Sequence, residues 1–110
     1  MTEAEFAELA EAVLEHLQHV LEASAAEVEV EEKGDGVLEL EFADGSKMIV
    51  NAHRAAREIW VAARAGGFHF RWDGGAWRDT REGTELLAAL SKLVSAQSGA
   101  PVVLAAPRSA

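Results

Sequence analysis

Hydrophobic residues near the start of the chain recur with two different periods. Between residues 6 and 21 they stand three and four positions apart, which is the spacing of one face of an α-helix. Thr2 and Glu5 have the Thr-x-x-Glu spacing of a capping box, so we expect the helix to begin directly after Thr2. From Glu27 to Glu31 valine and glutamate alternate, and this period of two predicts a half-buried β-strand.

Both predicted elements carry acidic residues opposite their hydrophobic residues. At about 100° per residue, the helix glutamates fall on the arc that faces away from the apolar stripe, with a histidine at its edge. Solvation readily explains one acidic helix face, but a second acidic row on the next strand is harder to dismiss. The predicted acidic ridge consists of Glu8, Glu11, Glu15, His19 and Glu22 on the helix, and of Glu27, Glu29 and Glu31 on the strand.

Alternating hydrophobic residues predict five further strands. Asp-Gly and Gly-Gly steps lie between several of them, and such steps favour the tight turns of β-hairpins. We expect strands at residues 38–42, 47–51, 59–63, 68–72 and 76–78, and a loop at residues 52–57, where no period is visible.

A second amphipathic helix is predicted near the end of the chain. Leucine and valine residues between positions 86 and 94 form its apolar stripe. Asp79 or Thr80 can cap its first turn, and Gly99 is typical of the position that ends a helix.

The predicted order of elements is one helix, about six strands and one helix. Short hairpin connections require antiparallel neighbours. We therefore expect an α+β fold, a two-layer sandwich in which both terminal helices pack on one face of an antiparallel sheet. One domain should span residues 1–104, in which residues 102–104 could pack back on the helices, and residues 105–110 should fray.

Charge is distributed unevenly along the chain. Residues 1–44 hold 14 of the 19 acidic residues and a single lysine, a net charge of −13, whereas residues 45–110 carry +4. The overall charge of −9 argues against nucleic acid and anionic membranes as partners, because both need Lys and Arg to neutralise phosphate. The acidic half should instead attract cations or basic protein surfaces.

The residue types present exclude several kinds of chemistry. The chain has no cysteine, which excludes disulfides, thiolate-bound zinc or iron–sulfur clusters and a cysteine nucleophile. No glycine-rich phosphate loop appears. No signal-peptide pattern is visible, and no apolar stretch approaches the roughly 20 residues that span a bilayer, so we expect a cytosolic protein.

The acidic ridge suits hard cations that prefer oxygen ligands. Iron, as Fe²⁺ or Fe³⁺, is a candidate alongside Mg²⁺, Ca²⁺ and Mn²⁺. His16 and His19 are three positions apart and could reach one cation, although the flank of any amphipathic helix can show the same pattern. Exposed carboxylates on a solvated ridge are not preorganised, so binding should be weak.

Trp60 stands out from the pattern of its strand. A tryptophan in a strand usually belongs to the core. Here the alternation assigns Ile59 and Val61 to the core and leaves the indole on the open face of the sheet, where His69 and Arg71 should also lie. An exposed aromatic ring beside cationic groups is a candidate anchor for a protein partner.

Taken in order, these features resemble the frataxin family, in particular its short bacterial CyaY branch. The resemblance runs from about Glu5 to Gly99 and rests on the ordered set, since no single piece is specific. The matching pieces are the acidic helix and strand, Asp44-Gly45-Ser46-Lys47, Ile49-Val50-Asn51, Ile59-Trp60, Gly66-Gly67-Phe68-His69-Phe70, Gly74-x-x-Trp77 and Leu86-Leu87 in the closing helix.

The resemblance implies the sandwich fold and a role in iron–sulfur cluster assembly. Members of the family bind iron weakly on the acidic ridge and bind the cysteine desulfurase and the scaffold protein of the assembly machinery. By position, the resemblance assigns iron binding to His19 and to the ridge acids Glu11, Glu15, Glu22, Glu27, Glu29 and Glu31. It places Asn51 and Trp60 on the surface of the sheet. His53 stands where the family usually has Gln, so a contact there is expected to differ.

Three functions are considered. The favoured one is a non-catalytic, cytoplasmic bacterial protein, monomeric when free, that binds iron and docks on the desulfurase–scaffold complex. A ferroxidase or iron-storage protein is the second, and it needs a buried carboxylate–histidine cluster that the sequence does not indicate. The third is an electrostatic adaptor with incidental metal binding. The expected partner-binding residues are Glu11, Glu15, Glu22, Asn51, Trp60, His69 and Arg71.

Overall fold

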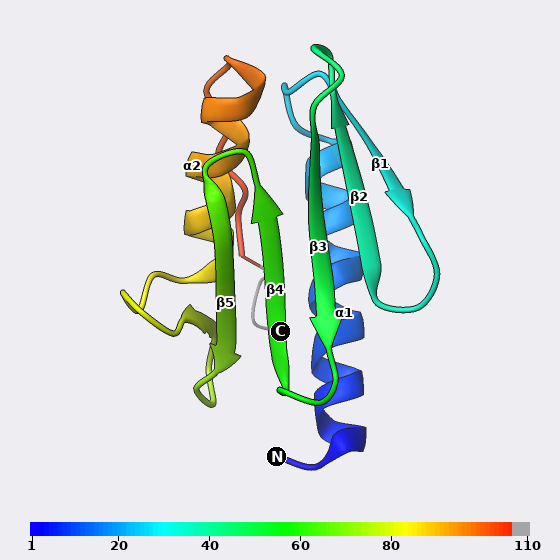
Figure 1. Ribbon diagram of the computed structural model, residues 1–110, viewed down its shortest axis with the longest axis vertical. Helices are drawn as coiled ribbons and strands as arrows, with labels where there is room; N and C mark the ends of the chain where they lie inside the picture. Colours follow the sequence, from blue (N-terminus) through cyan, green and yellow to red (C-terminus); the bar gives the residue numbers. More distant parts are fainter. Residues whose placement is uncertain (107–110) are drawn as a thin grey trace.

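The computed structural model describes residues 1–106 and shows two helices and one six-stranded antiparallel sheet (Figure 1). The strands lie side by side in chain order, so every connection between neighbours is a hairpin. The predicted α+β two-layer sandwich is confirmed. The elements are α1 (Glu3–Glu22), β1 (Val28–Glu32), β2 (Val37–Phe42), β3 (Lys47–His53), β4 (Glu58–Ala63), β5 (Gly66–Trp72), β6 (Trp77–Asp79) and α2 (Leu86–Ser98).

Both helices cover the same face of the sheet, and the other face is open (Figure 1). The register places Leu40 opposite Met48, and Val50 opposite Val61, so these side chains share the helix-covered face. All four are buried, and together with the apolar stripes of the two helices they form one continuous core. The alternation of the strands therefore decides which residues remain on the open face.

The start of α1 agrees with the prediction, and the end of β3 does not. Thr2 and Glu5 form the expected capping box, in which each side chain accepts a hydrogen bond from the other residue's backbone N–H. β3 continues to His53, so the predicted loop at residues 52–57 is wrong for its first two residues, because Ala52 pairs with β4. Neither helix of the described part of the chain is both long and apolar enough to cross a membrane.

The predicted cap of α2 is wrong, whereas its end is confirmed. Asp79 and Thr80 precede the first residue of α2 by several positions. Asp79 is the last residue of β6, and its Oδ1 accepts a hydrogen bond from the backbone N–H of Arg81. Glu85 caps the helix instead, and its carboxylate accepts hydrogen bonds from two N–H groups of the first turn. Gly99 ends the helix at a φ of 76°, a left-handed conformation that favours glycine.

The segment after α2 packs back on the helices, as predicted. Val102 and Leu104 are buried, and two serine hydroxyls of α2 accept hydrogen bonds from their backbone N–H groups. Within the stretch 105–110 that was predicted to fray, residues 107–110 lie outside the described residues.

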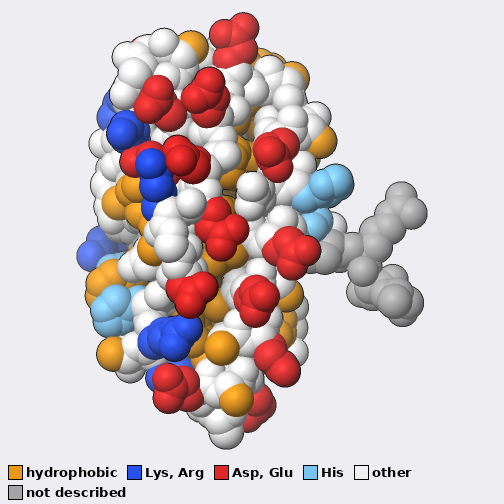
Figure 2. Space-filling view, turned by 90° about the vertical axis from the view of Figure 1, so that its right-hand side faces the viewer, with side chains coloured by type: hydrophobic (Ala, Val, Ile, Leu, Met, Phe, Trp, Pro, Cys, Tyr) orange, Lys and Arg blue, Asp and Glu red, His pale blue; other side chains and the backbone are white. Residues whose placement is uncertain are grey.

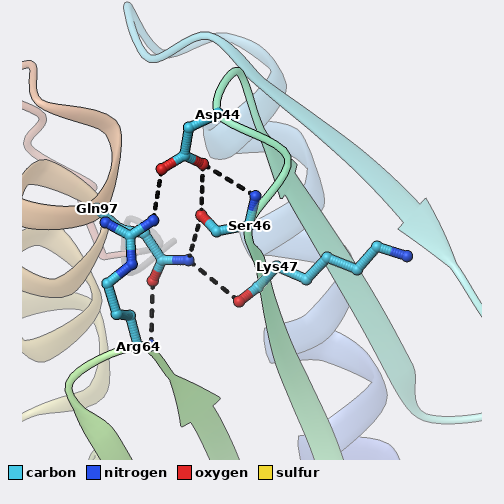
Figure 3. Close-up of polar contacts among 5 residues, drawn as sticks. All are labelled: Asp44, Ser46, Lys47, Arg64 and Gln97. Atoms are coloured by element: carbon cyan, nitrogen blue, oxygen red, sulfur yellow. Dashed lines mark hydrogen bonds and ion pairs between the residues drawn. The ribbon is translucent and has the colours of Figure 1, made fainter.

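A polar cluster around the buried side chain of Gln97 ties both hairpins at one end of the sheet to α2 (Figure 3). The Gln97 side chain is 7% exposed; it accepts a hydrogen bond from the backbone N–H of Arg64 and donates to Ser46 Oγ and to the carbonyl of Lys47. Asp44 accepts hydrogen bonds from Ser46 and from the Arg64 guanidinium, which hold the pKa of this carboxyl well below its usual range. The cluster thus joins three elements distant in sequence.

Gln97→Leu should lower the free energy of unfolding by about 2 kcal/mol, because the backbone groups of Arg64 and Lys47 lose their partner in a partly buried site. Urea unfolding measures the change. Lys92→Ala, on the exposed side of the same helix, is the control and should stay within about 0.5 kcal/mol of the native protein. A Gln97 variant as stable as this control would show that the cluster does not stabilise the fold.

Candidate functional site

The predicted ridge residues of α1 are all exposed on the side of the molecule that α1 shares with β1. Figure 2 shows this side, with many acidic side chains and hydrophobic patches between them. Because the apolar stripe of α1 packs on the sheet, its acidic arc must face outward. The exposed residues are Glu8, Glu11, Glu15, His19 and Glu22 on α1, and Glu27, Glu29 and Glu31 in and before β1.

The sheet register doubles the acidic row of β1. Glu29 pairs directly with Glu41 of β2, and Glu31 pairs directly with Glu39. Like charges opposite one another across two strands destabilise the pairing. The glutamates of β2 were not predicted as site residues, although their alternation was visible in the sequence, because their partners depend on the register.

Two lysines partly neutralise these paired acids. Lys33 Nζ lies 3.2 Å from Glu31 and 3.6 Å from Glu39, and Lys47 Nζ lies 3.4 Å from Glu39 and 4.0 Å from Glu41. The hydrogen bond and charge of Glu31, together with the charge of Glu39, raise the pKa of Lys33. A cation that binds here competes with built-in ammonium groups, which limits its affinity.

Five of the predicted ridge residues line two separate hollows. Glu11 and Glu15 line one of them, between α1 and the ends of β1 and β3. Glu22 lines the other, with Glu29 and Glu31 and the two glutamates of β2. Within residues 1–106, no three His, Asp or Glu side chains are grouped closely enough to hold a metal ion.

The two histidines of α1 do not converge on one cation. His16 is half-buried, and its Nε2 lies 2.7 Å from the carbonyl oxygen of Ala105, so this ring holds the C-terminal segment. His19 is exposed. Of the pair considered from the sequence, His19 is the more exposed.

An aromatic stack crosses the open face of the sheet. Trp60 lies between His53 and His69, with ring centroids 3.7 Å and 4.4 Å apart and interplanar angles of 12° and 10°. The three residues lie side by side on β3, β4 and β5. Trp60 pairs directly with His69 of β5. On β3 it pairs with Asn51, and His53 lies two residues further along on the same face. The predicted position of Trp60 on the open face is confirmed, although the ring is half-buried by its neighbours.

A buried carboxylate lies beside this stack, on the same face of β4. Glu58 is 5% exposed and accepts hydrogen bonds from Trp60 Nε1 at 2.9 Å and from Arg71 at 2.5 Å. Burial alone would raise the pKa of Glu58, but the hydrogen bonds from Trp60 and Arg71 outweigh it and lower the pKa. His69 Nδ1 lies 3.6 Å from the same carboxylate. Glu58 therefore fixes the orientation of the predicted surface residues Trp60, His69 and Arg71.

A frataxin-like domain family matches residues 1–100 of the chain. The chain belongs to the frataxin family. It is 57% identical over 104 residues to a protein of Dechloromonas aromatica named "Iron-sulfur cluster assembly protein CyaY", a match that covers 94% of this chain and 99% of the relative. A protein of the same name from Cupriavidus metallidurans is 51% identical over 108 residues, with 94% and 96% covered.

Solved structures of frataxins share the fold. The frataxin of Psychromonas ingrahamii superposes with a TM-score of 0.88 at 30% identity and covers 96% of this chain and 100% of its own. Trimeric frataxin of the yeast Saccharomyces cerevisiae, in a structure described as complexed with ferrous, gives a TM-score of 0.64 at 26% identity and covers 90% of this chain and 88% of its own. The family resemblance expected from the sequence is thus confirmed.

Proposed function

We propose that this protein is an accessory protein of iron–sulfur cluster assembly that binds iron weakly on its acidic surface and docks on a cysteine desulfurase–scaffold complex. The observation that carries the proposal is the set of like-charged glutamate pairs on β1 and β2, joined by the exposed acids of α1. Family membership, the names of the relatives and the ferrous-bound yeast frataxin support the same assignment.

Weak and distributed cation binding fits the geometry of these residues. The carboxylates repel one another, and a multivalent cation relieves that repulsion. Their oxygens suit Fe²⁺ and Fe³⁺ but also other divalent cations. Residues 1–106 contain no group of three ligands. We therefore favour iron as loosely held cargo rather than as a permanently bound metal.

We propose that the open sheet face supplies the second contact with the assembly complex. There the His53–Trp60–His69 stack, Asn51 and Arg71 present aromatic and cationic groups. We place this activity in the bacterial cytoplasm and treat the free protein as a monomer. A ferroxidase would require a converged cluster of carboxylates and histidine, so we prefer a non-catalytic role. A purely electrostatic adaptor would differ from the proposed iron-dependent protein, because it would keep its partner when iron is chelated.

Replacing Glu15, Glu22 and Glu29 together by glutamine should weaken Fe²⁺ binding by about tenfold, because the attraction of three carboxylates is lost. Anaerobic Fe²⁺ titration followed by NMR measures the affinity. The same variant without metal should melt at a higher temperature than the native protein, because repulsion within the acidic surface falls. Undiminished Fe²⁺ affinity in the triple variant would contradict the ridge assignment.

A control variant should act in the opposite direction. Lys33 and Lys47 occupy the space between the paired glutamates of β1 and β2. Lys33→Gln with Lys47→Gln should therefore tighten Fe²⁺ binding by about threefold or more, since the competing ammonium charges are removed.

A further inference from the structure

The two histidines that enclose Trp60 have different partners. His53 Nδ1 accepts a hydrogen bond from the backbone N–H of Ala56 at 3.2 Å, so this nitrogen carries no proton and the ring is neutral. His69 Nδ1 lies 3.6 Å from the carboxylate of Glu58, a position in which a protonated ring gains an ion pair. The indole is therefore stacked between a ring that is held in its neutral form and a ring that is placed beside an acid.

A proton has opposite effects on the two rings. Histidines ordinarily titrate between about pH 5 and 8, and protonation makes both ring nitrogens donors. On His69 the added charge strengthens the contact with Glu58. On His53 the new N–H points at the N–H of Ala56, so the hydrogen bond between them is lost. A half-turn of the His53 ring does not restore this bond, because a ring carbon then takes the place of Nδ1.

The β3–β4 turn, residues 54–57, is the part of the fold that this loss affects. The hydrogen bond between His53 and Ala56 closes the turn, and Arg57 within it has a φ of 55°. Among residues 1–106, Arg57 is the one non-glycine residue with a left-handed backbone, a conformation that costs energy for any residue with a side chain. Once the bond is lost, the partly buried N–H of Ala56 regains a partner only if ring and turn separate and water enters.

The charged groups around His53 determine whether its protonated ring stays on the indole. Attraction between a cation and the face of Trp60 favours that it stays. Glu58 is the direct partner of His53 on β4, but its carboxylate already accepts hydrogen bonds from Trp60 and Arg71 and lies beside His69. The other charged groups of the neighbouring turns are Asp35 between β1 and β2, and Arg54 and Arg57 directly after His53. A charged His53 therefore shares Glu58 with three other groups and meets the two arginines of its own turn.

We propose that His53 is a proton-sensitive cover over one face of Trp60. The neutral ring closes the three-ring stack, and the protonated ring leaves the indole together with the β3–β4 turn while His69 stays in place. The inference deepens the proposed function by adding regulation to the open sheet face, and its consequence for docking rests on that function. A partner can bury more of an uncovered aromatic face, so docking should strengthen as the pH falls.

NMR of the free chain between about pH 8 and 5.5 tests the cover without iron and without any partner. The nuclear Overhauser effects between the rings of His53 and Trp60 should fall at least fivefold, with the same midpoint as the titration of His53. Those between His69 and Trp60 should change less than twofold. The amide signal of Ala56 should shift with the midpoint of His53, because its hydrogen bond is lost.

Three results of this titration would overturn the proposal. The first is a protonated His53 whose ring still shows its full Overhauser effects to Trp60, which would mean that attraction to the indole holds the cation in place. The second is an equal loss on both sides of the indole, which would mean that the whole stack opens. The third is a His53 that keeps its neutral ring and its bond to Ala56 at the lowest pH.

Two matched variants place the effect on His53. In the free chain, His69→Gln should keep the shift of the Ala56 amide with pH, and His53→Gln should abolish it. His53→Gln should also bind the desulfurase–scaffold complex at least threefold more tightly than the native chain at pH 8, and equally at pH 5.5, where the native cover is open. The ratio of the two affinities cancels any titration of the partner.

A ratio that is the same at both pH values would overturn the regulatory role of His53. Loss of the Ala56 response in His69→Gln would overturn the assignment of the effect to His53. If the native chain does not bind the complex at either pH, the proposed function fails, whereas the titration of the free chain still decides whether His53 covers Trp60.

Discussion

Charge reversal of Glu11, Glu15 and Glu22 to lysine should slow association with a cysteine desulfurase by about 10- to 100-fold at low salt. The three side chains are exposed on α1, next to the acidic pairs of β1 and β2, so their fields add over one side of the molecule. A basic partner surface would be found faster because of this field. Surface-binding kinetics at low and high salt measure the rate.

Arg81→Glu with Lys92→Glu is the control for charge reversal away from the acidic side. Both residues are exposed, one before α2 and one on it, and their reversal should change the association rate by less than about threefold. Arg54 is not a suitable control. It belongs to the basic half of the sequence, but in the structure it lines the same hollow as Glu11 and Glu15. A rate that does not change with salt would contradict electrostatic steering.

Trp60→Ala should weaken binding to the assembly complex by about 2 kcal/mol or more, roughly 30-fold, as expected for an aromatic anchor. The change removes the centre of the stack with His53 and His69 and also a hydrogen bond to buried Glu58. We therefore expect a loss of about 1–2 kcal/mol in the free energy of unfolding as well. Calorimetric titration with the partner and urea unfolding measure the two effects separately.

Two further variants separate binding from stability. Trp60→Phe keeps an aromatic ring between the histidines but cannot donate to Glu58, so it should retain more affinity than the alanine variant. Trp72→Ala removes a tryptophan on the helix-covered face, where it packs against Trp77. It should lower stability with little change in partner affinity. If Trp72→Ala weakens binding as much as Trp60→Ala, the loss arises from unfolding.

The fold was largely predictable because local signals agreed with the tertiary structure. The capping box at Thr2, the alternation in each strand and the glycine turns each specify a piece, and antiparallel hairpins leave few ways to combine them. The cap of α2 was missed because two candidate residues preceded Glu85 and the end of β6 depends on pairing with β5. The sequence alone does not contain that pairing.

The candidate site was predictable only in part, because some of its residues are brought together by strand pairing that the sequence does not show. The exposed acids of α1 follow from helical periodicity, and the open-face position of Trp60 follows from alternation. The opposition of Glu29 and Glu41 depends on the register of β1 and β2. The placement of Glu32 and Asp35 in one hollow with Glu11 depends on how the β1–β2 turn lies against α1. The burial of Glu58 depends on side chains from neighbouring strands that cover it.

The position of β1 at the edge of the sheet has a consequence for the state of the protein in solution. An edge strand exposes unpaired N–H and C=O groups that invite another chain to add a strand. A second copy that paired with β1 would bring further glutamates beside Glu29 and Glu31, and their repulsion opposes such growth. The acids that we propose to bind cations should thus also oppose aggregation through the edge of the sheet, and variants that remove them should lose part of that protection.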